Sequence, residues 1–98
     1  MNIFKKKQLT RVIESIGRAA NIEPYEVNSL IKEYTNYENY ETAIKDLTYK
    51  IYRVFNDDID VRNYSLDMIR GIAPKFFKSK EEMISYSEKR LEESKEDF

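Results

Sequence analysis

The sequence predicts an all-α protein: a single domain built as a small, predominantly antiparallel bundle of four to five helices, with a helix-turn-helix-like corner near its N-terminus. With 98 residues, the chain is long enough for one hydrophobic core but not for two. It contains only two glycines and two prolines, too few for the turns of a β-sandwich or barrel. Its apolar residues recur at steps of three and four, the spacing of one helix face. The expected core contains Val12, Ile16, Val27, Leu30, Leu47, Ile51, Ile69 and Ile72.

Two helices around a tight turn are expected at the start of the chain. The first runs from about Asn2 to Ala20, and its apolar stripe is Leu9, Val12, Ile13, Ile16 and Ala20. Gly17 is small enough for the point where two helices cross, and Asn21 tolerates the left-handed conformation that the turn over residues 21–23 needs. Pro24 suits the first position of the next helix, where no amide donor is required. The inner face of that helix is Val27, Leu30, Ile31 and Tyr34.

A second apolar stripe follows and does not align with the stripe of residues 24–34. Its members are Tyr40, Ala43, Ile44, Leu47, Ile51, Val54 and Phe55. Between the two stripes, Thr35, Asn36 and Asn39 are only modest helix formers. We therefore expect a kink or short break between residues 35 and 39. One continuous helix from residue 24 to residue 55 is the alternative that the sequence leaves open.

Two further helices complete the predicted bundle. Residues 56–58 end the third helix, and the fourth is expected from Val61 or Ser65 to Ala73. Pro74 ends it, because the residue before a proline is disfavoured in the helical region. Ser79 and Glu82 have the spacing of a capping box, which predicts a last helix from Lys80 to about Lys95. The apolar residues of this helix are sparse, so we expect its far end to be solvated.

The composition argues against an enzyme. The chain has no histidine and no cysteine, so the usual general base, thiol nucleophile and thiolate metal ligands are missing. The aspartates at Asp57, Asp58 and Asp60 do not fit a calcium loop. Counted from Asp58, such a loop has Asn63 where glycine is needed and Ile69 where a bidentate glutamate is needed. We expect a non-enzymatic binding protein without a metal or cofactor.

The charge is unevenly distributed along the chain. The net charge is −1, but residues 1–20 carry five bases against one acid, and residues 79–98 carry four bases against seven acids. The basic start suits a polyanionic partner. No apolar run approaches the ~20 residues of a membrane-spanning helix, so we expect a cytoplasmic protein. Its abundant Lys, Asn, Ile and Tyr are typical of an AT-rich bacterial or phage genome.

A helix-turn-helix over residues 12–30 is often a reader of nucleic acid, either DNA or RNA. The exposed start of the second helix would then meet base edges through Pro24, Tyr25, Asn28 and Ser29. The phosphates would be held by Lys5, Lys6, Lys7, Arg11 and Arg18. Negative charge near this face, from Glu23, Glu26 and Glu33, opposes that interpretation. The alternative is an αα-corner within an ordinary bundle.

Residues 18–34 also resemble a known family. Glu26-Val27-Asn28, Leu30-Ile31-Lys32 and the aromatic Tyr34 match the last helices of the M domain of the signal recognition particle GTPase, in a partial resemblance over residues 11–47. The resemblance implies a helix-turn-helix that contacts RNA, with Arg18 at a basic position before the turn. The family's glycine-rich turn is replaced by Ala19-Ala20-Asn21, and three methionines are too few for its signal-peptide groove. The resemblance therefore implies the corner geometry but not signal-peptide binding.

The eight tyrosines support a rival hypothesis. Tyr37, Tyr40 and Tyr52 would form an exposed surface for a protein partner, since amphipathic rings are enriched in interface hot spots. The protein would then be a helical interaction module, such as a phage accessory factor or a bacteriocin-immunity-like protein, with its first helix against a partner or a membrane surface. The same rings would equally suit the edge of a core. The sequence leaves the oligomeric state open.

Overall fold

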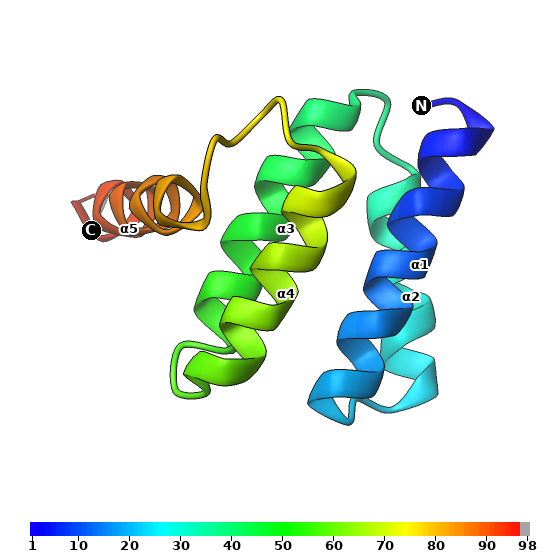
Figure 1. The fold of residues 1–98 in the computed structure, drawn as a ribbon, viewed down its shortest axis with the longest axis horizontal. Helices are drawn as coiled ribbons and strands as arrows, with labels where there is room; N and C mark the ends of the chain where they lie inside the picture. Colours follow the sequence, from blue (N-terminus) through cyan, green and yellow to red (C-terminus); the bar gives the residue numbers. More distant parts are fainter. Residues whose placement is uncertain (97–98) are drawn as a thin grey trace.

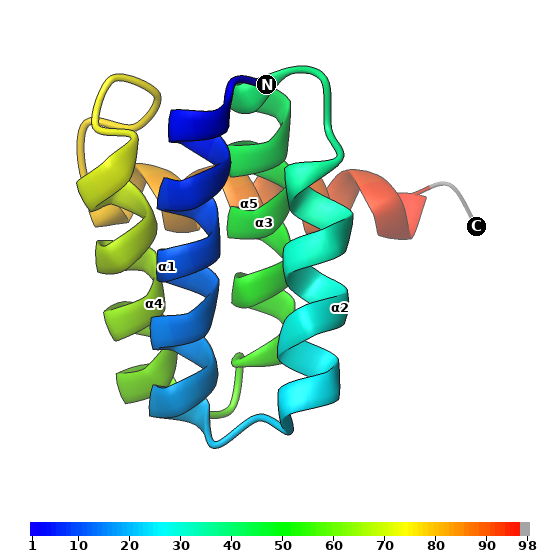
Figure 2. The same ribbon diagram turned by 90° about the vertical axis from the view of Figure 1, so that its right-hand side faces the viewer.

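The computed structural model describes residues 1–96 and contains five helices and no strand within that range. The helices are α1 (Ile3–Ala20), α2 (Pro24–Thr35), α3 (Tyr40–Val54), α4 (Ile59–Ile72) and α5 (Lys80–Glu96). Helices α1 to α4 lie side by side and alternate in direction, while α5 runs across them (Figures 1 and 2). Helix α1 packs against α2 and α4, and α5 packs against α3 and α4. The predicted all-α bundle is confirmed.

The core lies where the inner faces of the helices meet, and most of its predicted members are confirmed. Val27, Leu30 and Ile72 are the exceptions, because each is only partly buried at the edge of the core. Helix α2 contributes a single fully buried residue, Tyr34. The buried apolar residues are Leu9, Val12, Ile13, Ile16, Tyr34, Tyr40, Ala43, Ile44, Leu47, Tyr49, Ile51, Leu66, Ile69, Ala73, Phe77 and Met83.

The turn between α1 and α2 has the geometry that its sequence predicts. Asn21 adopts the left-handed conformation with φ of 56° and ψ of 44°, and it is the one non-glycine residue with positive φ in the described part of the chain. The backbone N–H of Asn21 donates to the carbonyl of Arg18 (3.3 Å), and that of Ile22 donates to the carbonyl of Gly17 (2.9 Å). These two bonds satisfy carbonyls that the end of a helix leaves unpaired.

Side-chain caps set the starts of the later helices. The predicted break at residues 35–39 is confirmed, because Asn39 accepts a hydrogen bond from the Thr42 N–H (2.9 Å) and starts α3. Asp58 accepts from the Val61 N–H (3.2 Å), so α4 begins at Ile59 and the predicted start at Val61 or Ser65 is wrong. Asp58, which was expected at the end of the third helix, is therefore the cap of the fourth.

The predicted capping box before α5 forms in part. Ser79 Oγ accepts a hydrogen bond from the backbone N–H of Glu82 (3.1 Å). The Glu82 carboxylate reaches back to the backbone N–H of Lys78 (3.4 Å), one residue before the serine. Two donors at the start of the helix are satisfied by this exchange. Helix α5 continues to Glu96, and its last described side chains, residues 92–95, are exposed as expected.

Candidate functional site

The outer face of α1 carries an aligned row of basic side chains. Lys7, Arg11 and Arg18 are exposed, and their spacing places all three within an arc of about 40° on the helix. Opposite them lie the residues that α1 buries, among them Leu9 and Ile16. From Lys7 to Arg18 the helix rises about 16 Å. We call Lys7, Arg11 and Arg18 the basic stripe.

The charges of the basic stripe are not neutralised by ion pairs. The ion pairs among residues 1–96 join Glu41 to Lys45 (2.7 Å), Asp67 to Lys80 (3.7 Å) and Asp46 to Arg90 (2.7 Å), and none involves α1. Within α1, Arg18 donates to the Ser15 hydroxyl (3.2 Å), a neutral group. Glu14 is exposed on the same face and reduces the positive charge between Arg11 and Arg18. With Glu14 counted, this face of α1 still carries three cations against one anion.

Two further lysines stand at the start of α1 and differ in their surroundings. Lys6 is exposed, whereas Lys5 is half-buried, with its ammonium 5.0 Å from the centre of the Tyr40 ring. A cation at this distance from an aromatic face is stabilised by the charge distribution of the ring. Lys5 therefore has a packing role in the monomer that the sequence did not predict.

The residues predicted to bind nucleic acid fall into two groups at opposite ends of the molecule. Because α1 and α2 run in opposite directions, the lysines at the start of α1 lie far from Tyr25 and Ser29 at the start of α2 (Figure 1). Arg18 belongs to the second group, since it lines a shallow hollow together with Pro24 and Asn28. Tyr25, Asn28 and Ser29 are all exposed. The basic stripe extends along α1 from the first group, at Lys7, to the second group, at Arg18.

The rival hypothesis requires Tyr37 and Tyr40 to be exposed, and the structure contradicts this requirement. Tyr40 is 8% exposed, and its hydroxyl donates to the carbonyl of Ile72 (3.4 Å). Tyr37 is half-buried and stacks on Tyr34, with 5.5 Å between ring centres. Tyr52 is also half-buried, and the guanidinium of Arg62 lies 5.8 Å from the centre of its ring. Tyr40 is thus part of the core and Tyr37 packs against it, whereas Tyr52 is not among the residues that pack against the core.

A polar network fixes that loop to α3 and α5. The Tyr37 hydroxyl donates to one carboxylate oxygen of Asp46 (2.7 Å), and Arg90 donates to the other (2.7 Å). Arg90 also donates to the hydroxyl of Tyr86 (3.1 Å). The hydrogen bond to Asp46, followed by burial, raises the pKa of Tyr37 to about 12. Burial is the main cause of the raised pKa of Tyr34.

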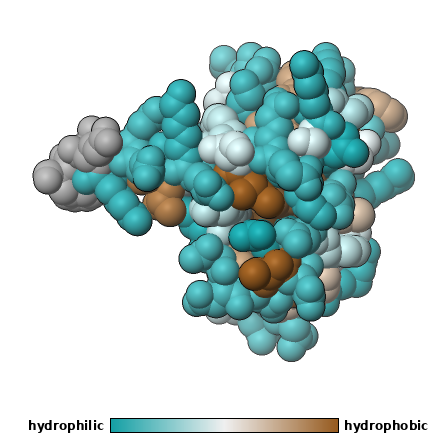
Figure 3. Space-filling model, turned by 60° about the vertical axis from the view of Figure 1, so that its left-hand side comes forward, coloured by the Kyte–Doolittle hydropathy of each residue, from teal (hydrophilic) through white to brown (hydrophobic). Residues whose placement is uncertain are grey.

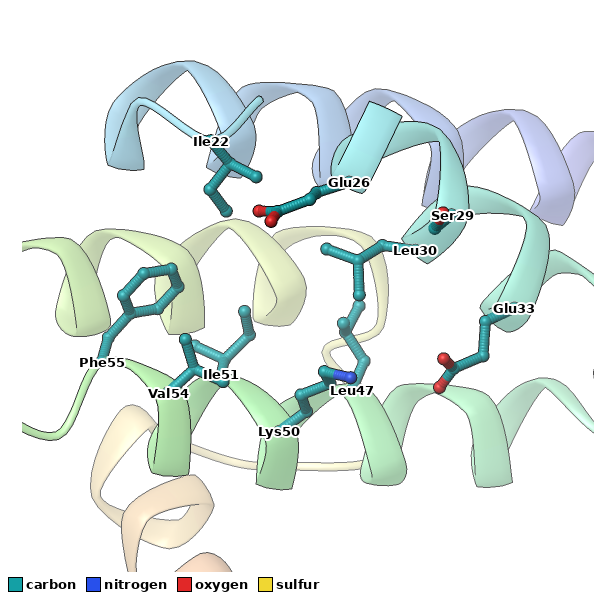
Figure 4. Close-up of a pocket in the computed structure, with 10 residues that line it drawn as sticks. All are labelled: Ile22, Glu26, Ser29, Leu30, Glu33, Leu47, Lys50, Ile51, Val54 and Phe55. Atoms are coloured by element: carbon teal, nitrogen blue, oxygen red, sulfur yellow. The ribbon is translucent and has the colours of Figure 1, made fainter. Parts of the chain in front are cut away.

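An apolar groove lies between α2 and α3, and periodicity alone did not predict it. Its volume is about 330 Å³, and Leu30 on one side faces Leu47 and Ile51 on the other (Figure 4). Val54 lines the end of the groove and is 59% exposed. Polar side chains stand at its rim. The lining residues are Ile22, Glu26, Ser29, Leu30, Glu33, Leu47, Lys50, Ile51, Val54 and Phe55.

The face of the molecule drawn in Figure 3 is mostly hydrophilic. On the face drawn in Figure 3, apolar residues gather only in small patches among hydrophilic ones. At the start of α1, Ile3 and Phe4 are 72% and 66% exposed.

No helix within residues 1–96 is long and apolar enough to cross a membrane. No group of three His, Cys, Asp or Glu side chains in this range is arranged to hold a metal ion.

Comparison with known proteins finds no match for this chain. No family model matches the chain, and neither a curated protein nor a solved structure shows significant similarity to it. The two surface features that bear on the function of this protein are the basic stripe and the α2–α3 groove.

Proposed function

We propose that this protein is a small, non-enzymatic nucleic-acid-binding protein whose basic stripe contacts the phosphates of a DNA or RNA duplex. The observation that carries this function is the row of exposed cations, Lys7, Arg11 and Arg18, none of which is in an ion pair within the described residues. Phosphate contacts supply most of the affinity in non-specific binding and fix the protein on the duplex. Lys6 extends the contact at the start of α1.

The tip of the α1–α2 hairpin is where base contacts would be made. Asn28 is exposed beside Arg18 in one hollow, and Ser29 and Tyr25 are exposed on the same helix start. Amide and hydroxyl groups are the side-chain partners that hydrogen-bond to base edges. The partial resemblance to the signal recognition particle M domain supports Arg18 as an RNA contact at this turn. Glu23 and Glu26 are exposed nearby, and their negative charges would repel phosphate. The surface that favours nucleic acid is therefore on the side of α1.

A nucleic-acid partner is consistent with a cytoplasmic protein of a bacterium or phage, the origin that the composition suggests.

The test of the proposed function is a titration of a labelled 20-base-pair duplex with the protein at several salt concentrations. Three phosphate contacts give a slope of about −3 for log K against log[salt]. Vesicles of phosphatidylserine are the comparison, because the exposed Ile3 and Phe4 lie beside the stripe and would suit an anionic membrane surface. Binding to these vesicles but not to the duplex would overturn the proposed function.

A further inference from the structure

The α2–α3 groove lies on the loosely packed side of α2, because α2 contacts α1 far more extensively than it contacts α3. Tyr34, near the end of α2, is 2% exposed, whereas Val27 and Leu30 are only partly buried. Helix α5 packs against α3 and α4 and does not line the groove. Leu47 and Ile51 form the floor of the groove and are almost fully buried, whereas Leu30 is partly exposed and Val54 is largely exposed at the groove's opening (Figure 4).

We propose that this groove is a docking site for an amphipathic helix of a partner protein, one that carries basic residues along the flank facing α2. No residue of the basic stripe lines the groove, and Ser29 is the one proposed base-contacting residue at its rim. Helix-in-groove recognition uses apolar anchors at positions i, i+3 or i+4, and i+7 of the incoming helix. The apolar lining of the groove has a matching length, because α3 rises about 10 Å between Leu47 and Val54.

The charges at the rim determine which helix fits. Glu26 and Glu33 both line the groove on the α2 side, are exposed and stand seven residues apart, or two helical turns and about 10 Å. Two Lys or Arg residues spaced by seven on the partner would face both carboxylates at once. On the α3 side the rim residue is Lys50, which favours an acidic residue on the opposite flank of the partner. Complementary charges of this kind fix the orientation of a docked helix.

The experiment uses two designed peptides of 14 residues with identical leucine anchors at i, i+3, i+4 and i+7. One carries lysines at two flank positions seven residues apart, and the other carries glutamates there. We expect the lysine peptide to bind the full-length protein at least tenfold more tightly than the glutamate peptide in a fluorescence anisotropy titration. The double variant Glu26→Lys/Glu33→Lys is expected to reverse this preference, since both residues are exposed and their replacement leaves the core intact.

A matched pair of variants tests the groove itself. Val54→Asp places a charge in the groove, and Ile59→Asp places the same charge on an equally open position outside it, since the two side chains are 59% and 56% exposed. We expect the lysine peptide to lose at least tenfold in affinity with Val54→Asp and to keep its affinity with Ile59→Asp. Equal effects of the two variants, or no binding of either peptide, would overturn the docking site.

A second copy of the chain is the competing occupant, and sedimentation velocity distinguishes it. We expect the wild-type protein alone to sediment as a monomer. A dimer that Val54→Asp dissociates would show that the groove binds the protein itself and would contradict a partner helix. The duplex titration on the wild-type protein shows separately whether the proposed nucleic-acid binding holds, because it does not depend on a peptide binding in the groove.

Discussion

A Cβ atom placed on Gly17 would lie 2.5 Å from Cγ2 of Val27. This distance is shorter than van der Waals contact allows, so α1 and α2 approach each other here only because residue 17 has no side chain. The backbone conformation of Gly17 is that of an ordinary helix, and its φ is not positive. The role predicted for Gly17 from the sequence, the small residue where the two helices meet, is therefore confirmed.

Gly17→Leu is expected to destabilise the protein. The added side chain would meet Val27 directly, and overpacking of this kind costs about 1–3 kcal/mol in the free energy of unfolding. For a domain of this size, the melting temperature would fall by on the order of 10 °C. Gly71→Ala is the matched control, because a Cβ there meets nothing within 4 Å and alanine favours the helix. Thermal melts of both variants in which Gly17→Leu equals the wild type would contradict the close approach.

Tyr40 is expected to behave as a core residue in a stability measurement. It is 8% exposed, and its ring packs at 6.0 Å from the ring of Phe76, between ring centres. Tyr40→Ser should cost about 3–5 kcal/mol, the range for truncating a buried aromatic residue. Tyr25→Ser, at a position 68% exposed, should change the stability by less than about 0.5 kcal/mol. Urea unfolding of the two variants checks this, and a Tyr40→Ser protein as stable as the wild type would place the ring in solvent.

The tyrosine network predicts a loss of stability at high pH. The pKa of Tyr37 is raised from its ordinary value of 10.0 to about 12 in the folded protein, so the folded state holds the phenolic proton more tightly than the unfolded chain does. This contribution is fully present below about pH 10 and is lost as the pH rises to about 12. Urea midpoints measured between pH 9 and pH 12 should decrease over this window.

Asp46→Asn separates the cause of that pH dependence from general alkaline unfolding. Hydrogen bonding to the Asp46 carboxylate is the largest cause of the raised pKa of Tyr37. In the variant, the absorbance of ionised tyrosine should therefore rise at lower pH than in the wild type. Tyr37→Phe, which lacks the phenol, identifies the Tyr37 step in the titration. Identical titrations for the wild type and Asp46→Asn would show that the hydrogen bond does not control this ionisation.

The helices and their limits were predictable because local chemistry decides them. Asn21 and Pro24 mark the turn, and Ser79 starts α5, as their side chains and backbone preferences indicate. Local chemistry also misled at Asp58, because residues 56–58 were expected only to end the third helix. Asp58 in fact caps the next helix, so α4 starts at Ile59, two residues before Val61, the earlier of the two expected starts.

The surfaces were less predictable, because they depend on how far apart the helices lie. Periodicity assigned Leu30 to the core, but α2 packs only loosely against α3, and this side chain lines the groove and is partly buried. The burial of Tyr40 follows from its contacts with the chain near Ile72 and Phe76, more than 30 residues away in the sequence. The spacing of Lys7, Arg11 and Arg18 on one helix was by contrast available from the sequence alone, since a single helix determines it.

The most direct test of the proposed nucleic-acid binding compares two triple charge reversals in one duplex titration. The first replaces the stripe, Lys7→Glu/Arg11→Glu/Arg18→Glu. The second has the same net charge but changes exposed lysines outside α1, Lys32→Glu/Lys78→Glu/Lys89→Glu. At 50 mM salt, we expect the wild type and the second variant to bind a labelled 20-base-pair duplex within a fewfold of each other, and the first variant to lose at least tenfold. Equal losses in the two variants, or no binding by the wild type, would contradict a basic stripe that contacts phosphates.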